Sequence, residues 1–185
     1  MKYDPFATFI DDVESVRRSI GSEGELVRQI ATRLAQLNRS ADWLPASARQ
    51  ASDDGYLQHL LHVAPDGGFS VVALVWKPEQ WTPIHNHVAW CVVGVYEGVE
   101  REIRYEVKRE GAEAYLVEKQ IRTATAGSVE GLVPDGSDIH AVGNAGDCVA
   151  ISIHVYGADL RKLGSSIDRR YDMLPLGQRA QQAAR

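Results

Sequence analysis

The chain has 185 residues and a net charge of −5, a length that most naturally forms one domain, here taken as residues 1–185. Hydrophobic residues make up 44% of it and charged residues 24%, an ordinary globular composition that excludes disordered and fibrous proteins. The basic residues are scattered rather than clustered, so we expect no nucleic-acid partner and no membrane partner, but a small solute.

The sequence also carries signals of cellular location. Cys91 and Cys148 are too few for a disulfide scaffold and suit a reducing cytoplasm, although a single bridge between them stays open. Residues 1–12 lack the basic and apolar regions of a signal peptide. The least charged stretch, residues 80–96, is too short and too polar to cross a bilayer. We therefore expect a cytoplasmic protein.

The first predicted elements are two amphipathic helices within residues 4–38. Asp4 is an N-cap candidate before a proline suited to the first turn. Gly21 ends the first helix, and Ser22 with Glu25 forms a candidate capping box for the second. Apolar residues recur at spacings of three and four, at Phe6, Phe9, Ile10, Val13, Val16 and Ile20, then at Leu26, Ile30, Leu34 and Leu37.

After a connecting segment at residues 39–55, the chain changes to short β-rich runs separated by Gly, Pro and Asp. So many short strands without helical crossovers predict an antiparallel barrel or sandwich over about residues 56–156. The tail, residues 160–185, is expected to lie on the surface or to fray. The predicted strands are 56–63, 69–76, 84–88, 91–96, 101–107, 115–121 and 148–156.

Three histidines of the β region predict a metal site. His85 and His87 are separated by one residue, so the strand period of two directs both imidazoles to one face. His140 follows a Gly/Asp-rich stretch where a later strand returns to the barrel interior. Neutral imidazole suits iron, zinc, copper and nickel alike. An ordinary position on half-buried strands is the alternative, and His59 and His62 are assigned to the surface or the core edge.

A second polar pattern lies on the last predicted strand. Ser152, His154 and Tyr156 alternate with apolar residues and therefore share one face. The simpler interpretation is a strand that exposes this face to solvent. If the face borders the metal site, the serine hydroxyl fixes the imidazole, which in turn orients or deprotonates the phenol.

Two segments resemble the signatures of the cupin superfamily. PIHNHVAWCVVGVYEG resembles the first, a histidine pair followed by a run that ends in a glycine, here Gly98. GSVEGLVPDGSDIHAVGN resembles the second, with its proline and late histidine. Most cupins have a glutamate ligand a few residues after the histidine pair, where this chain has Cys91. The resemblance implies an all-β cupin double-stranded β-helix, a small antiparallel barrel, carrying the N-terminal helical hairpin.

With Cys91 and the strand SIHVY, the chain resembles the thiol dioxygenases typified by cysteine dioxygenase, over about residues 56–156. In that family a three-histidine iron centre accompanies an SxHxY strand and, in many members, a cysteine that is thioether-linked to the tyrosine. The resemblance implies Fe(II) as cofactor, and a small thiol and O₂ as substrates. It also implies the metal ligands His85, His87 and His140, the catalytic residues Ser152, His154, Tyr156 and Cys91, and a crosslink between Cys91 and Tyr156.

The expected substrate rests on Gln58. Cysteine dioxygenases have an arginine two residues after a tyrosine, where this chain has Tyr56 and then Gln58. Glutamine hydrogen-bonds a carboxylate but forms no bidentate ion pair. The chain is thus similar to the glutamine-type bacterial branch, which acts on 3-mercaptopropionate but usually has glycine in place of Cys91. We expect a 3-mercaptopropionate-like thiol carboxylate to be converted to its sulfinate, with Arg161 as a candidate second cation.

Other functions stay open. They are a cysteine dioxygenase that gives cysteine sulfinate, a non-catalytic metal-binding cupin sensor, and a zinc or nickel isomerase or hydrolase with His154 as base. Trp76, Trp81 and Trp90 are expected in core packing, with one of them in the pocket wall. The sequence predicts no particular oligomeric state.

Overall fold

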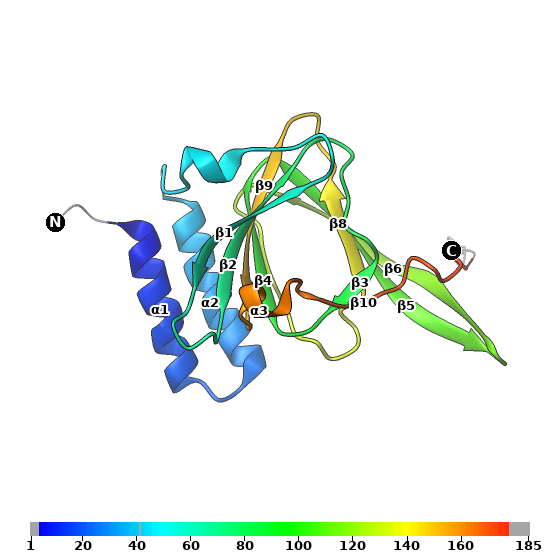
Figure 1. Ribbon diagram of the computed structural model, residues 1–185. Helices are drawn as coiled ribbons and strands as arrows, with labels where there is room; N and C mark the ends of the chain where they lie inside the picture. Colours follow the sequence, from blue (N-terminus) through cyan, green and yellow to red (C-terminus); the bar gives the residue numbers. More distant parts are fainter. Residues whose placement is uncertain (1–3, 41, 178–185) are drawn as a thin grey trace, which may run out of the picture.

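The computed structural model describes residues 4–40 and 42–177, and these form a helical hairpin followed by two five-stranded antiparallel sheets (Figure 1). The strand orders are β1-β2-β9-β4-β7 and β10-β3-β8-β5-β6. The predicted all-β double-stranded β-helix with an N-terminal helical hairpin is therefore confirmed. The strands are β1 (Leu57–Val63), β2 (Ser70–Trp76), β3 (His85–His87), β4 (Cys91–Glu97), β5 (Val99–Glu110), β6 (Glu113–Thr125), β7 (Val129–Leu132), β8 (His140–Asn144), β9 (Ala150–Tyr156) and β10 (Ile167–Arg170).

The two long helices are α1 (Pro5–Ser19) and α2 (Glu23–Asn38). The Asp4 carboxylate caps α1 by accepting hydrogen bonds from two backbone amides, at 3.0 and 3.2 Å, as predicted. Ser22 is at the N-cap of α2, but its side chain makes no capping hydrogen bond. The capping box is wrong because Glu25 instead binds side chains of the next turn. Two shorter helices follow, a 3₁₀ turn (Ala46–Arg49) and α3 (Leu160–Leu163).

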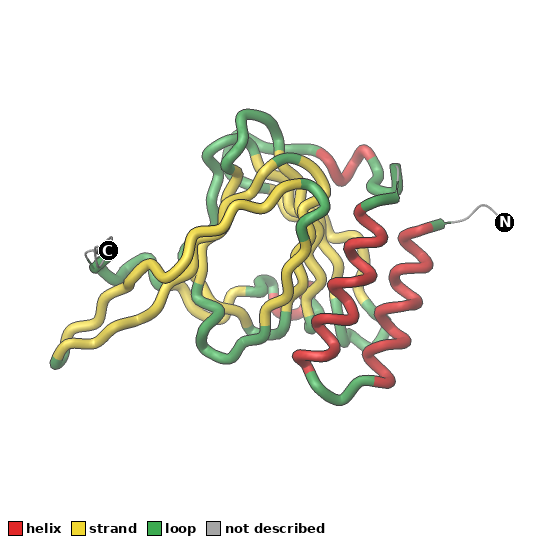
Figure 2. Tube along the Cα trace, turned by 180° about the vertical axis from the view of Figure 1, so that it is seen from behind, coloured by secondary structure: helices red, strands yellow, loops and turns green. Residues whose placement is uncertain are grey.

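The helical hairpin covers the outer face of the first sheet (Figure 2). Strand β9 divides its side chains accordingly. Ile151, Ile153 and Val155 join the core shared with the helices, whereas Ser152 and His154 are buried on the opposite, inner face. The polar face of β9 thus lies inside the barrel, and the solvent-exposed alternative is wrong.

Glycines allow the close approach of helix and sheet. A Cβ at Gly94 would lie 3.0 Å from Leu34 Cδ2, and a Cβ at Gly131 would collide with Val27, both residues of α2. Gly98, the last residue of the first cupin-like signature, has a φ of +81° between β4 and β5, a conformation that favours glycine.

The structure differs from the predicted elements mainly after residue 97. The β5–β6 hairpin is longer than predicted and extends away from the barrel on the side opposite the helices (Figure 1). Strands β7 and β10 were not predicted, and β8 was predicted only as a later strand that returns near His140. The tail was expected to lie on the surface or to fray, and its strand β10 lies at the surface, with three of four residues exposed, but is held in place by pairing with β3. Residues 178–185 of the predicted tail lie outside the described residues.

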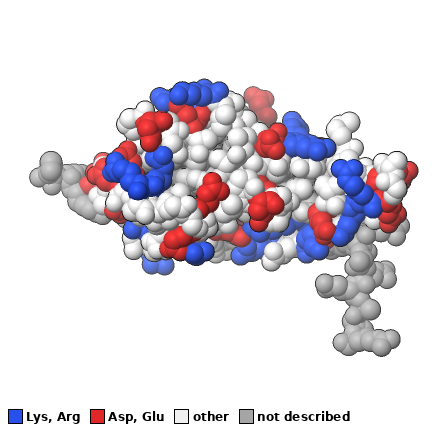
Figure 3. All heavy atoms as spheres, turned by 90° about the horizontal axis from the view of Figure 1, so that it is seen from below, with Lys and Arg blue, Asp and Glu red and all other residues white. Residues whose placement is uncertain are grey.

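Three further features concern membrane-spanning helices, surface charge and the two cysteines. No helix among the described residues is long and apolar enough to cross a membrane. Acidic and basic side chains are interspersed on the face seen in Figure 3. Cys91 is buried, Cys148 is exposed, and both are free thiols, so the disulfide left open by the sequence is absent.

Candidate metal centre

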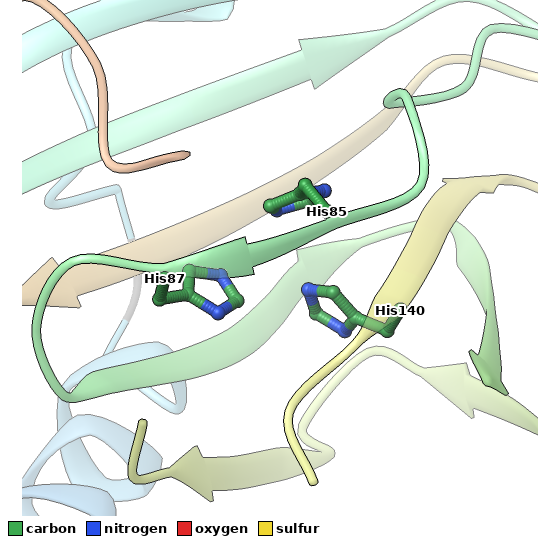
Figure 4. A group of neighbouring side chains, drawn as sticks. All are labelled: His85, His87 and His140. Atoms are coloured by element: carbon green, nitrogen blue, oxygen red, sulfur yellow. The ribbon is translucent and has the colours of Figure 1, made fainter. Parts of the chain in front are cut away.

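Three imidazoles gather inside the barrel (Figure 4). His85 and His87 come from β3, and His140 comes from β8, where its Cα pairs with that of His85. The ring centroids form a nearly equilateral triangle with sides of 4.8, 4.9 and 4.9 Å. One ligand nitrogen from each ring lies within 4.8 Å of the others, and all three residues are buried. The structure thus brings the three predicted ligands together.

Each of the three imidazoles is fixed by a hydrogen bond at its Nδ1 atom. His85 Nδ1 donates to the carbonyl of Pro83 at 2.8 Å. The same atom of His87 donates to Asp138 Oδ2 at 3.2 Å, and that of His140 donates to Glu102 Oε1 at 2.7 Å. Because all three Nδ1 atoms are occupied, Nε2 is the free nitrogen of each ring, and such outer contacts fix ligand tautomers at metal sites.

Burial and neighbouring charges set the protonation of these groups. Burial, with the charges of His140 and His87, lowers the pKa of His85 to about 3. Burial raises the pKa of Asp138, but hydrogen bonds from the His87 ring and backbone outweigh it, and the pKa lies below its ordinary value. His85 is therefore neutral at pH 7, the state in which imidazole binds a metal, while Asp138 is a carboxylate.

The polar side chains of β9 form a hydrogen-bonded chain on the opposite wall. The Ser152 hydroxyl contacts His154 Nε2 at 2.8 Å, and the Tyr156 hydroxyl contacts His154 Nδ1 at 3.0 Å. Burial, with the charges of the three-histidine set, lowers the pKa of His154 to about 3, and burial raises the pKa of Tyr156 well above its ordinary value. All three groups are therefore uncharged at neutral pH.

Cys91 lies beside this chain. Its Cα is the cross-strand partner of Tyr156 in the β4–β9 ladder, a pairing that brings side chains within contact. Burial raises the pKa of the Cys91 thiol, and the hydrogen bond to Tyr156 offsets this only in part. Cys91 is therefore a neutral thiol in contact with the Tyr156 phenol.

The three histidines line one cavity of about 40 Å³ together with His154 and Tyr156 of the β9 chain, room on the order of three waters. Gln58 and Tyr56 line the same cavity, as does Trp76. The segment after α3 contributes Ser166 and Ile167, so the tail that was expected to lie on the surface or to fray forms part of the cavity wall. A site of this size suits a small ligand.

Not every predicted residue is in this cavity. Arg161 does not line it, and its guanidinium binds Asp159 at 3.0 and 3.1 Å. Trp90 is in the core as expected, but Trp81 is 37% exposed, because it lies on an isolated bridge outside the named strands. His59 and His62 are on β1, outside the three-histidine set.

Sequence reasoning missed the groups that hold the imidazoles. Asp138 precedes His140 by two residues, and Glu102 follows the alternation that directs every second residue of β5 inward. Arg170 was also missed. Its Cα pairs with that of His85, and its charge partly offsets the burial that raises the pKa of Tyr56. An acidic residue at an inward position near a candidate ligand was the available signal.

The donor set fits a divalent transition-metal ion. Three neutral nitrogens, fixed by outer contacts and facing a cavity, match the preferences of iron, zinc, copper or nickel sites without selecting among them. In this arrangement Nε2 of His85, His87 and His140 would hold the ion, and Tyr156 would border the remaining positions.

Comparison with known proteins yields fold-level likenesses. No family model matches the chain. An RmlC-like cupin protein from Desulfovibrio desulfuricans has 19% identity and a TM-score of 0.45, over 64% of this chain and 96% of that chain. A cupin superfamily protein from Desulfitobacterium hafniense has 14% identity and a TM-score of 0.46, over 65% and 94%. Bacillus subtilis oxalate decarboxylase, described with Mn(II) centres, has 16% identity and a TM-score of 0.43, over 60% and 28%. At these identities the likeness concerns the fold alone.

The class of protein now follows from the fold and the site together. The chain has a cupin-type double-stranded β-helix with a potential three-histidine metal site in its interior. This combination fits a metalloenzyme or a metal-binding cupin.

Proposed function

We propose that the protein is an iron(II)- and O₂-dependent thiol dioxygenase that converts a small, 3-mercaptopropionate-like thiol carboxylate into its sulfinate. The supporting observation is that His154 and Tyr156 line the same cavity as the three-histidine set, and that the buried Ser152 joins them in one hydrogen-bonded chain. Burying three polar side chains costs free energy. A protein that only stored a metal would gain nothing from a phenol held beside it.

The overall reaction is R–SH + O₂ → R–SO₂H, in which the sulfur is oxidised and both oxygen atoms of O₂ are transferred to it. Iron(II), when bound, would supply the positive charge that favours the thiolate and the redox chemistry that O₂ requires. His85, His87 and His140 would hold it through Nε2, the nitrogen left free by their outer contacts.

The role of the β9 chain is to hold a proton at the Tyr156 hydroxyl. His154 Nδ1 contacts this hydroxyl, and Ser152 fixes the other ring nitrogen, so the phenol has a defined orientation toward the cavity. A positioned hydroxyl of this kind stabilises charge on the reacting oxygen and sulfur atoms.

Gln58 and Tyr56 would receive the substrate carboxylate at the cavity wall. We propose Arg170 as the cation in place of Arg161, because its Cα pairs with that of His85 across β10–β3 and its charge reaches Tyr56. Arg170 does not line the cavity, and its guanidinium binds Asp172 at 3.0 Å, so the substrate carboxylate would replace Asp172 as its partner. This arrangement favours a thiol acid without an amino group. We expect kcat/KM to be highest for 3-mercaptopropionate, lower for L-cysteine and lowest for cysteamine, which has no carboxylate.

Cysteine is the second candidate substrate, and Cys91 beside Tyr156 is the observation that favours it. A thioether between the Cys91 sulfur and the Tyr156 ring would remove one hydrogen atom from each side chain, with O₂ as the oxidant. Mass spectrometry of the two peptides after incubation with iron and O₂ tests for this bond.

Metal analysis combined with an oxygen electrode tests the proposed function. Iron in the protein, with thiol-dependent O₂ uptake and sulfinate formation, would support it. Bound metal without turnover would indicate a sensor, and zinc with oxygen-independent turnover would indicate an isomerase or hydrolase. Either of the last two results would overturn the proposal.

A further inference from the structure

One buried acid lies next to the β9 chain and has no part in the proposed reaction. Glu100 of β5 is 3% exposed. Its Oε1 has no hydrogen-bond partner among the described residues. It lines a second cavity of about 130 Å³, which shares Val93, His140 and Val142 with the substrate cavity. An unpartnered carboxyl oxygen is costly to bury and calls for a functional explanation.

Glu100 is connected to the chain through Ser152. The Ser152 hydroxyl and the Trp76 indole both interact with the Glu100 carboxyl. The Trp76 indole also donates to Ser152 Oγ at 3.3 Å. Burial raises the pKa of Glu100 to about 7, because these hydrogen bonds compensate for the lost hydration only in part. Both protonation states are therefore accessible near neutral pH.

The protonated state fixes one direction of hydrogen bonding. A protonated Glu100 donates to Ser152 Oγ, so the Ser152 hydroxyl donates to His154 Nε2. The His154 ring then carries its proton on Nδ1 and donates it to the Tyr156 oxygen. In this state the Tyr156 hydroxyl proton is free to point into the substrate cavity.

Ionisation of Glu100 reverses the direction of each hydrogen bond in the chain. A Glu100 carboxylate accepts the Ser152 proton, so Ser152 Oγ accepts a proton from His154 Nε2. The His154 ring then has a bare Nδ1, which accepts the Tyr156 hydroxyl proton. In this state Tyr156 offers only lone pairs to the cavity.

We propose that Glu100 is the fourth member of the chain Ser152–His154–Tyr156 and sets the direction of its hydrogen bonds, and thereby decides whether Tyr156 donates or accepts in the substrate cavity. Glu100 acts through Ser152 and His154 and is thus a positioning residue. The catalytic meaning rests on the proposed function, whereas the switch of His154 between its two neutral tautomers does not.

Other charged groups face Glu100 but are paired with one another. Arg122 and Glu130, from β6 and β7, line the same cavity and form an ion pair. Glu102 of the same strand binds His140 of β8 and Arg104. On β9, the chain that starts at Ser152 contains His154, which burial keeps neutral. None of these groups has a hydrogen bond to Glu100 among the described contacts.

Nitrogen-15 NMR of the histidine rings tests the proposal on the full chain, without substrate or iron. Zinc serves as a diamagnetic probe metal, the signals are assigned with His154→Gln, and the titration runs from about pH 5.5 to about 8.5, across the range where the acid titrates. We expect the proton of His154 to move from Nδ1 at low pH to Nε2 at high pH. The same shift is expected with and without zinc, because the chain Glu100–Ser152–His154 contains no metal ligand.

Glu100→Gln should hold His154 in one tautomer ratio at every pH, because an amide does not titrate. Ser152→Ala should also make the His154 tautomer ratio independent of pH, because it removes the hydroxyl that connects Glu100 to His154. Glu106→Gln, the same change at a half-buried position of β5 outside both cavities, should titrate like the unmodified protein. A His154 signal that does not change across the range, or a change that persists in Glu100→Gln, would overturn the proposal. Zinc stoichiometry and thiol oxidation are measured separately, so a failed metal site or a failed dioxygenase activity leaves this titration interpretable.

Discussion

The two sheets build unlike halves of the candidate site. Strands β3 and β8 of one sheet present three imidazoles. Each is fixed by a hydrogen bond to an acceptor outside the three-histidine set, at Pro83, Asp138 and Glu102. Strand β9 of the other sheet presents a serine, a histidine and a tyrosine that are tied mainly to one another. The first half is held rigid by outer contacts, whereas the second is a chain whose protons can shift.

This difference separates metal binding from proton positioning. If the comparison is correct, changes in β3, β8 and their acceptors should act on metal content. Changes in β9 should leave the metal in place and act on turnover.

Loss of one metal ligand should disrupt metal binding by the three-histidine set. His140→Ala should abolish sulfinate formation and sharply reduce iron content, because one of three ligands is gone and its space is left open. Iron per chain and thiol-dependent O₂ uptake are the measurements. His59→Ala, a change on β1 outside the three-histidine set, should keep both. Normal iron and activity in His140→Ala would remove that residue from the site.

Loss of the phenol hydroxyl should impair turnover through the β9 chain and leave metal binding unchanged. Tyr156→Phe should retain iron but lose turnover by roughly 10²-fold or more, the usual scale for a positioned proton donor. Tyr105→Phe provides a control, since Tyr105 is equally buried but belongs to a separate cluster. If Tyr156→Phe turned over at the normal rate, the β9 chain would be ordinary strand packing.

Weakening an outer contact should affect the metal rather than the chemistry. Asp138→Asn keeps the shape of the side chain but removes the charge that holds His87. Metal affinity should fall by about 10–100-fold, while turnover of the fully loaded protein changes less. Competition with a chelator measures the affinity, and Asp135→Asn in the same loop serves as control. An unchanged metal affinity would contradict the claim that these outer hydrogen bonds hold the three histidines in place.

The cation proposed for the substrate gives a smaller effect. Arg170→Ala should raise KM for 3-mercaptopropionate by roughly tenfold, the scale of one charge-assisted hydrogen bond, with little change in kcat. Arg170→Lys should recover part of the loss. Arg169→Ala, the adjacent arginine that packs on Tyr171, should have no such effect. An equal effect of both alanine variants would argue against Arg170 as the carboxylate partner.

The raised pKa of Glu100, about 7 in the folded chain against 4.5 as its ordinary value, affects stability. The folded protein binds this proton more tightly than the unfolded chain does. The contribution to the free energy of unfolding is therefore full below about pH 4.5 and is lost as the pH rises through about 7. Between about pH 5 and about pH 8, this loss amounts to roughly 2–3 kcal/mol. Urea unfolding at about pH 5 and about pH 8 measures this loss. The free energy of unfolding should fall by roughly 2–3 kcal/mol less in Glu100→Gln than in Glu106→Gln.

Much of this arrangement was predictable from local periodicity. The period of two on SIHVY predicts which side chains of β9 share a face, and the helical spacing of Leu26, Ile30 and Leu34 predicts the face that packs on the sheet. These patterns are properties of single segments. They need no knowledge of what lies opposite.

The remaining features depend on pairing between distant segments. Strand β10 is four residues long and three of them are exposed, so only its register with β3 identifies it. Asp138 and Glu102 are recognisable as outer contacts only once the register fixes their distance to His87 and His140. Arg161 was predicted as a candidate cation from its proximity to Tyr156 in the chain, and proximity in the chain does not reveal that its guanidinium binds Asp159 outside the cavity lining.

The central claim is that the site transfers both atoms of O₂ to the sulfur of a small thiol carboxylate. Mass spectrometry of the product formed by the iron-loaded protein from 3-mercaptopropionate under oxygen-18 gas tests it most directly. The account predicts a sulfinate in which both oxygen atoms carry the label. A product limited to the disulfide, or a sulfinate with oxygen from water, would contradict it.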